Sequence, residues 1–278
     1  MLIETCLERE EPADTAPEAG GWAERLTPRY VAKPWGRRDG LPAPDEAQPL
    51  GEMIFEAPDA GLTIKWLQTS EPLSVQVHPQ GPGRKHEWWH VTEALPGAYL
   101  DLGLEAPASR QAIAQAARDG TLPSLLRRIR PQAGDSFYIR AGTIHALGPG
   151  LTVLEVQEHS DVTYRLFDYG RPRELHLAQA LFEARTEVEP VEALPGAGAP
   201  FALSQFALNP GGQVVLVPER ACLAVLSGEG TIAGRPFAAN QCWLTHGPVA
   251  LHADTPAHLV LAEPRSARST LAEGDLLP

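Results

Sequence analysis

The stretch Leu73-Ser74-Val75-Gln76-Val77-His78-Pro79 alternates apolar and polar side chains, and it is the best starting point for interpreting the chain. Successive side chains of a β-strand point to opposite faces, so Ser74, Gln76 and His78 share one face if this stretch is a strand. An amide and an imidazole on one face could serve as metal ligands. The same alternation is also typical of the solvated face of a half-buried sheet, and both interpretations stay open at this point.

Two further side chains of the type that binds metals lie downstream. Glu87 lies nine residues after His78, and His145 follows a second alternating run, at residues 136–140. With Gln76 they make a mixed nitrogen and oxygen set that contains no thiolate. Sets of this kind suit a catalytic zinc or a similar divalent ion. Spacing alone leaves open whether residue 145 approaches residue 78.

Four blocks of sequence, in a fixed order, carry a resemblance to a known family. They are Leu73–Pro79, Lys85-x-Glu87-x-Trp89, Gly134-Asp135-x5-Ala141-Gly142-Thr143-x-His145-Ala146 and Tyr164-Arg165-x2-Asp168-Tyr169-Gly170-Arg171. In these blocks, and from about residue 28 to residue 169, the chain resembles the type I mannose-6-phosphate isomerases, which are zinc-dependent cupin enzymes. The resemblance implies one Zn²⁺ per chain, or another divalent ion. Its ligands would be Gln76, His78, Glu87 and His145.

Four further residues are expected to act on the substrate near the metal, and the resemblance implies the role of Arg165 among them. Arg165 would be catalytic, and Lys85 would act in catalysis or contact the substrate. Ser74 would bind the substrate phosphate. Arg140 stands where the family usually has proline, and it would add a cation near an anionic substrate.

Each of the three cations also has an ordinary structural explanation. Lys85 could be a turn lysine, and Arg140 could be a solvated arginine at the rim. Arg165 could be the ion-pair partner of Asp161 or Asp168. The proton-transferring base is not indicated by any motif, and Glu158, His159 and Tyr138 are the candidates considered for it.

The predicted fold is mainly β: a cupin (jelly-roll) barrel with a small helical cap, followed by a second, degenerate cupin-like β unit. We expect an acidic N-terminal arm at residues 1–22 and a catalytic cupin domain at residues 23–186. A metal-free β domain would occupy residues 187–278, because turn signals are frequent there and no set of ligand-type residues has metal spacing.

A helical insertion is expected at residues 108–130 of the catalytic domain. Ser109 is a good N-cap and Gly120 fits the C-terminal stop of a helix between them. A second helix is predicted from apolar residues at i, i+3, i+4 and i+7, with a proline near its first turn. These residues are Leu122, Leu125, Leu126 and Ile129.

Composition limits the partners and the compartment. Lys and Arg number 23 and Asp and Glu 35, giving a net charge of −12. This balance argues against nucleic acid, which needs clustered cations, but allows a small sugar phosphate. The chain has three cysteines, an odd number, and no two of them are close in sequence: Cys6, Cys222 and Cys242. This pattern predicts free thiols in a reducing compartment. We expect no signal peptide and no membrane span, which would need about 20 apolar residues. The protein is therefore expected to be cytoplasmic, as a monomer or small homo-oligomer.

The activity implied by the resemblance is interconversion of mannose 6-phosphate and fructose 6-phosphate through an enediolate. One alternative is a cupin isomerase that acts on another sugar phosphate. A second is a non-catalytic sugar-binding or regulatory cupin.

Overall fold

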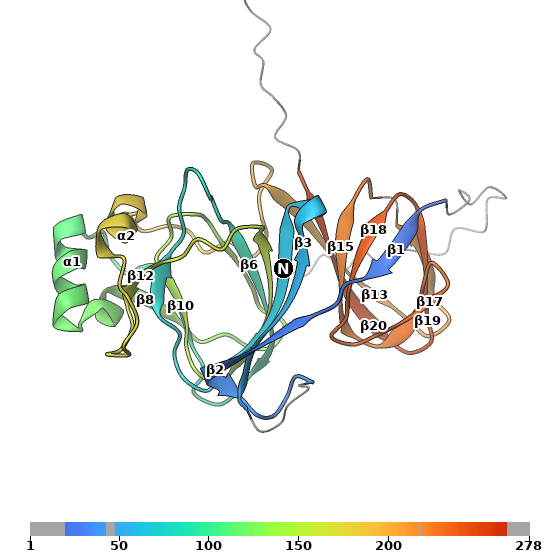
Figure 1. Ribbon diagram of the computed structural model, residues 1–278, viewed down its shortest axis with the longest axis horizontal. Coiled ribbons are helices and arrows are strands. Elements are labelled where there is room, and N and C mark those ends of the chain that lie inside the picture. The colour runs from blue at the N-terminus through green and yellow to red at the C-terminus, as the bar shows by residue number, and fades with distance from the viewer. Residues whose placement is uncertain (1–19, 43–47, 217, 266–278) are drawn as a thin grey trace, which may run out of the picture.

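The computed structural model describes residues 20–42, 48–216 and 218–265 of the chain, and it is mainly β. Most of the expected acidic arm, and Cys6 with it, therefore lies outside the described residues. The described strands pair antiparallel in four sheets, two in each of two β units (Figure 1). Two α-helices are found within the described ranges, so the prediction of a mainly β fold is confirmed.

The first β unit consists of a six-stranded and a five-stranded sheet. The six-stranded sheet has the order β2-β3-β4-β11-β6-β9, and the five-stranded sheet has the order β12-β5-β10-β7-β8. Their bounds are β2 (Arg29–Arg37), β3 (Leu50–Ala57), β4 (Leu62–Gln68), β5 (Val75–Val77), β6 (Glu87–Ala94), β7 (Leu100–Leu104), β8 (Leu126–Ile129), β9 (Ser136–Ile139), β10 (His145–Leu147), β11 (Leu151–Glu158) and β12 (Tyr164–Phe167).

The stretch Leu73–Pro79 contains β5 (Val75–Val77), which is the second strand of its sheet. Its apolar residues Val75 and Val77 are fully buried against the helices, as period-2 alternation requires. Gln76 is paired with His145 of β10 on one side and with Arg165 of β12 on the other. Strand pairing therefore brings three predicted site residues, far apart in sequence, into one row across the sheet.

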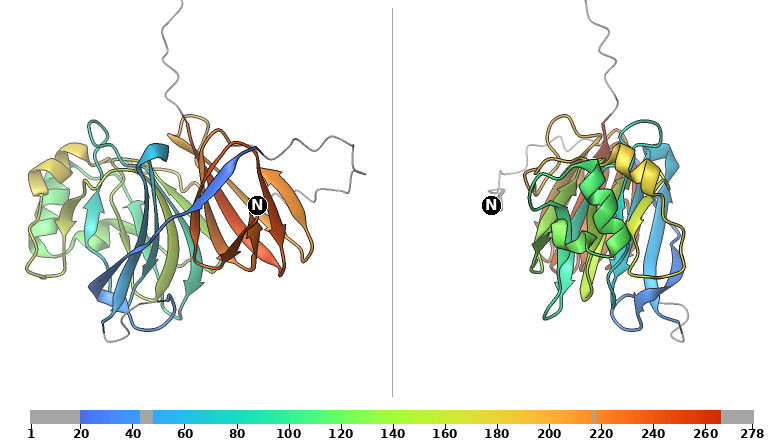
Figure 2. Two further views of the ribbon diagram at one scale, coloured as in Figure 1. Left: turned by 45° about the vertical axis from the view of Figure 1, so that its right-hand side comes forward. Right: turned by 90° about the vertical axis from the view of Figure 1, so that its left-hand side faces the viewer.

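The two helices cover the outer face of the five-stranded sheet, at the end of the molecule away from the second β unit (Figures 1 and 2). α1 (Arg110–Asp119) begins after Ser109, whose side chain accepts a hydrogen bond from the Ala112 amide, and ends at Gly120 with φ +77°. α2 is Leu177–Glu183. The helix predicted from Leu122 to Ile129 is wrong. The 3-10 helix η2 (Leu122–Leu125) is followed there by β8, because the apolar residues pair with the sheet edge at β7.

The second β unit has two sheets, β1-β18-β15-β20-β13 and β14-β19-β16-β17. Its strands are β1 (Trp22–Arg25), β13 (Phe201–Leu208), β14 (Gln213–Leu216), β15 (Ala221–Ser227), β16 (Glu229–Ile232), β17 (Arg235–Ala238), β18 (Cys242–His246), β19 (Val249–Ala253) and β20 (Ala257–Pro264). Its interior is a continuous apolar cluster that includes Leu223, Trp243 and Leu259. β1 belongs to this unit although it lies near the N-terminal end of the chain, so the chain crosses between the units twice.

A single apolar core joins the two β units. The outer face of the six-stranded sheet contributes Trp66 and Trp88, and the second unit contributes Phe201, Cys222 and Cys242. The two cysteines are buried and free, as expected for these positions. This core supports from behind the strands whose inward faces carry the candidate site. Within the described residues, no helix is both long enough and apolar enough to cross a membrane.

Candidate metal centre

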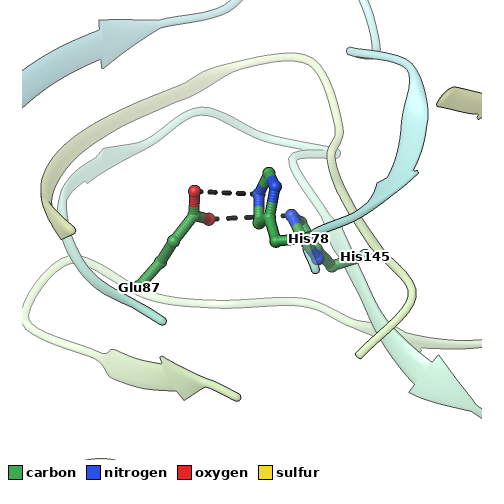
Figure 3. Close-up of side chains that lie close together, drawn as sticks. All are labelled: His78, Glu87 and His145. Carbon is green, nitrogen blue, oxygen red and sulfur yellow. Dashed lines mark ion pairs between the residues drawn. The ribbon is translucent and has the colours of Figure 1, made fainter. Parts of the chain in front are cut away.

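Three ligand-type side chains meet inside the first β unit. His78 follows β5, Glu87 begins β6 and His145 begins β10. Nε2 of His78 lies 3.0 Å from Oε1 of Glu87, and Nε2 of His145 lies 3.6 Å from Oε2 (Figure 3). One ligand atom from each residue lies within 4.8 Å of the other two, and no residue of the three is more than 1% exposed. The structure thus brings residue 145 to residue 78, which spacing alone could not establish.

Backbone carbonyls orient both imidazole rings. Nδ1 of His78 lies 3.0 Å from the carbonyl oxygen of Val162, and Nδ1 of His145 lies 2.8 Å from that of Thr143. A carbonyl only accepts, so each Nδ1 carries the proton and each Nε2 presents its lone pair. Such outer hydrogen bonds are the usual means of fixing the tautomer of a metal-binding histidine.

The site favours neutral histidines and a charged carboxylate. Burial lowers the pKa of His78 to about 3, and the nearby Lys85 lowers it further. Burial also lowers the pKa of His145. Burial would raise the pKa of Glu87, but His78 and Lys85 outweigh it and hold that pKa well below its usual value. At neutral pH the three side chains are therefore in the protonation states that a divalent cation needs.

This arrangement places two hydrogen-bond acceptors against each other. The Nε2 lone pair of His78 faces the Glu87 carboxylate at 3.0 Å, and neither His78 Nε2 nor Glu87 Oε2 has a hydrogen-bond donor among the described residues. Glu87 Oε1, the oxygen at 3.0 Å, has Lys85 as its donor, but the buried Nε2 of His78 and Oε2 of Glu87 have none among the residues that the structure describes. Buried acceptors without a donor are costly, so these two atoms favour a bound cation. The lowered pKa of His78 makes a proton a poor candidate for that cation. The donor set and its orphaned atoms fit a divalent metal ion.

Gln76 lies beside this cluster. Its amide nitrogen is 3.3 Å from Nε2 of His145, and its Oε1 accepts a hydrogen bond of 3.4 Å from Ser74. The oxygen, which is the atom that a metal would bind, therefore points toward Ser74 in this structure. Gln76 as a fourth ligand stays a prediction, and it requires the amide to turn over.

A second layer of charged side chains lies next to the cluster. The sequence analysis named Lys85 in this layer but missed Lys65 and Glu155. Lys85 is 3.0 Å from Glu87 Oε1 and 3.4 Å from Gln157 Oε1. Lys65 of β4 is 2.9 Å from Glu155 Oε1 and 2.5 Å from Gln157 Oε1. Burial lowers the pKa of Lys65, but Glu155 and Glu87 more than reverse this effect, so the pKa is raised. The signal in the sequence was a charge at an inward position of an otherwise apolar strand.

The other predicted site residues lie in different surroundings. Arg165 is level with Gln76 on β12, and its guanidinium makes no ion pair within the described part of the chain. Asp168, its suggested partner, instead binds Arg171 at 3.0 Å and Arg173 at 2.5 Å. Arg140 is paired at 2.5 Å with Glu192 in the segment that leads to the second β unit.

The three candidates for the base all have other partners. Glu158 accepts from Arg84 at 2.7 Å, and His159 Nδ1 lies 2.9 Å from Thr63 Oγ1. Tyr138 bonds His86 at 2.7 Å, and burial raises the pKa of its hydroxyl to about 12. Glu155 shares the inward face of the sheet with Glu87, and it too has partners, the Lys65 ammonium and the Trp89 indole N–H, each at 2.9 Å.

Comparison with known proteins agrees with the geometry. A mannose-6-phosphate isomerase from Streptococcus mutans is 38% identical over 148 residues, which cover 48% of this chain and 46% of the relative. The mannose-6-phosphate isomerase ManA of Bacillus subtilis is 36% identical over 149 residues, with 48% and 45% covered. These matches confirm the resemblance to the mannose-6-phosphate isomerases. The chain spans about half the length of the curated relatives it matches. No family model matches the chain.

Solved structures share the fold over nearly the whole chain. The crystal structure of the mannose 6-phosphate isomerase from Bacillus subtilis superposes with a TM-score of 0.71 at 22% identity, covering 86% of this chain and 98% of that one. A point mutant of phosphomannose isomerase from Salmonella typhimurium also gives 0.71, at 14% identity, with 88% and 100% covered. The predicted fold class is confirmed by these likenesses, which cover both β units.

Proposed function

We propose that this protein is a metal-dependent aldose–ketose isomerase that interconverts mannose 6-phosphate and fructose 6-phosphate. The observation that carries the proposal is the buried set His78, Glu87 and His145, in which two acceptors converge at 3.0 Å. The names of the curated relatives support the choice of substrate. The metal would be Zn²⁺, because its preferred ligands include imidazole nitrogen and carboxylate oxygen.

The reaction moves a proton between neighbouring carbons and develops negative charge on the sugar oxygens. A bound divalent ion would supply Lewis-acid polarisation of those oxygens. Arg165, whose guanidinium is uncommitted in the described structure, would bind and stabilise the same oxygens. Glu155, held by Lys65 and by the indole N–H of Trp89 at 2.9 Å, would accept the proton from one carbon and return it to the next.

The substrate would enter along the inward row that β5, β10 and β12 form. Ser74 would bind the phosphate, and Lys85 would add positive charge beside the carboxylate of Glu87. Arg140 would reach the substrate only by releasing Glu192, so its role is secondary in this proposal. A cytoplasmic location is part of the proposal, supported by the two unpaired buried cysteines.

A panel of substrates tests the proposal. The purified protein would be loaded with Zn²⁺ and offered mannose 6-phosphate, glucose 6-phosphate, ribose 5-phosphate and unphosphorylated mannose, with the ketose product measured in each case. Turnover should be highest with mannose 6-phosphate. Turnover with another phosphate alone would instead favour an isomerase of different specificity. Sugar-phosphate binding without turnover would favour the non-catalytic cupin.

A further inference from the structure

Three segments meet on the side of the metal cluster where α2 ends. The first is the corner Pro79-Gln80, directly after His78, and the second is Ala141-Gly142, three residues before His145. The amide of Gly142 donates a hydrogen bond of 2.9 Å to the carbonyl oxygen of His78, so the two histidine-bearing segments are joined directly. The third segment is the C-terminal end of α2.

Gln80 is bonded twice to the last residue of α2. Its backbone amide donates to Oε2 of Glu183 at 2.8 Å, and its side-chain amide donates to the backbone oxygen of Glu183 at 2.7 Å. The Gln80 side chain lies against Gly142, where a Cβ would come within 2.7 Å of it. Gly142 also has φ +87°, a conformation that favours glycine. Gln80 is therefore bonded to the end of α2 on one side and packed against Gly142 on the other.

The end of α2 is itself anchored to the second corner and to α1. The amide of Arg185 donates to the oxygen of Gly142 at 2.8 Å, and its Nε donates to the oxygen of Ala141 at 2.9 Å. From α1, Nε of Arg110 donates to the oxygen of Leu181 at 2.7 Å. The helix end is thus a fixed support for both corners.

We infer that Gln80 and Glu183 are positioning residues, which hold the His78 and His145 segments at the separation that metal binding needs. The inference rests on the metal site of the proposed function, but not on the identity of the sugar. Both residues act through the backbone of the ligand segments, and neither takes part in the metal cluster. Groups that orient metal ligands from outside typically change metal affinity by about 10- to 100-fold.

The test compares Glu183→Ala with Glu183→Gln. The amide of glutamine keeps an oxygen that can accept from the Gln80 amide, whereas alanine removes it. The Zn²⁺ dissociation constant, measured by competition with a chromophoric chelator, should rise about 10- to 100-fold in Glu183→Ala and return close to the wild-type value in Glu183→Gln. In the metal-free protein, exchange of the Gln80 amide hydrogen should be faster in Glu183→Ala than in the wild type.

The Gln80 side of the contact is tested by a second variant, with a matched control in α1. Gln80→Met keeps much of the side-chain length but removes the donor, and it should also weaken zinc binding. Gln115→Ala removes an exposed amide–carboxylate contact within α1, to Asp119 at 3.0 Å, and should leave zinc binding unchanged. Wild-type zinc affinity in both Glu183→Ala and Gln80→Met would overturn the inference.

Loss of stability must be separated from loss of positioning. Positioning predicts weaker zinc binding in variants whose metal-free form melts within a few degrees of the wild type. A metal-free form that melts far below the wild type, in both variants, would show a general structural role and overturn the inference. Because the readout contains no sugar, absence of isomerase activity in a zinc-binding protein would refute the proposed function and leave this inference standing.

Discussion

Lys65 and Glu155 form an ion pair of 2.9 Å across neighbouring strands inside the first β unit, with side chains 17% and 5% exposed. Glu155 also accepts a hydrogen bond from the indole N–H of Trp89. The ammonium of Lys65 also donates a hydrogen bond to the side-chain oxygen of Gln157. This pair lies on the same inward face as the metal ligand candidate Glu87. The pair is therefore a largely buried polar contact, and Glu155 is the carboxylate to which the proposed function assigns proton transfer.

Removal of one partner of this pair should be strongly destabilising. Lys65→Met and Glu155→Gln each leave part of a buried polar network unpaired, and a broken buried pair typically costs about 3–5 kcal/mol. The double variant should lose clearly less than the sum of the two losses, because no unpaired charge remains. Urea unfolding of the four proteins measures this coupling, and strictly additive losses would show that the two side chains do not depend on each other.

His145→Ala should abolish tight metal binding and leave the fold largely intact. The imidazole is fully buried, but its removal also relieves the crowding of acceptors around Glu87. Metal content after dialysis, measured by mass spectrometry, should fall from one equivalent to near zero, while far-UV circular dichroism is retained. His258→Ala, at an exposed position of β20, is the control. Full metal content in His145→Ala would remove residue 145 from the ligand set.

Arg165→Ala should keep the metal and lose turnover. The Arg165 side chain has no ion-pair partner within the described residues, so its removal leaves no buried charge behind. The loss in kcat should be about 100- to 1,000-fold, the range for removal of one group that stabilises developing charge. Arg118→Ala in the last turn of α1 provides a matched exposed arginine. Unchanged kcat in Arg165→Ala would exclude a catalytic role.

The metal-free protein should lose stability as the pH falls below about 6.5. The pKa of His78 is about 3 in the folded protein, against an ordinary 6.5. Between these values the unfolded chain binds a proton at His78 and the folded chain does not, so acid favours unfolding. The lowered pKa of Glu87 acts in the same direction below its ordinary 4.5.

Thermal melting in the presence of a chelator measures this dependence. The melting temperature of the wild type should fall between pH 6.5 and pH 5, and His78→Gln should show a shallower fall because one linked proton is removed. Parallel curves for the two proteins would mean that His78 titrates alike in the folded and unfolded chains.

Much of the site could be predicted from local patterns. Alternation placed Gln76 of β5 and His78, directly after it, on the same inward face, and the capping residues Ser109 and Gly120 predicted the ends of α1. The candidate ligand Glu87 is named from the block Lys85-x-Glu87-x-Trp89, which carries the family resemblance. These features depend on residues within a few positions of one another, which is the range over which sequence determines backbone conformation directly.

Other features depend on long-range pairing and could not be found in this way. Lys65 and Glu155 are 90 residues apart, and only the pairing of β4 with β11 brings them together. Likewise, the helical spacing from Leu122 to Ile129 gave the wrong element, because pairing with the edge of β7 outweighs local helical preference. The ion pair of Arg140 with Glu192, 52 residues away in the sequence, could not be predicted from local sequence either. The domain boundaries at residues 22 and 186 remain a proposal, and β1 shows that residues near the first boundary pair with the second β unit.

The most direct test of the central claim is to follow isomerisation of mannose 6-phosphate while the metal is removed and restored. If the proposed function is correct, protein stripped by a chelator forms no fructose 6-phosphate, and one equivalent of Zn²⁺ per chain restores turnover in the wild type but not in His145→Ala. Turnover that survives complete removal of the metal, or stoichiometric zinc in the wild type with no fructose 6-phosphate formed, would contradict it.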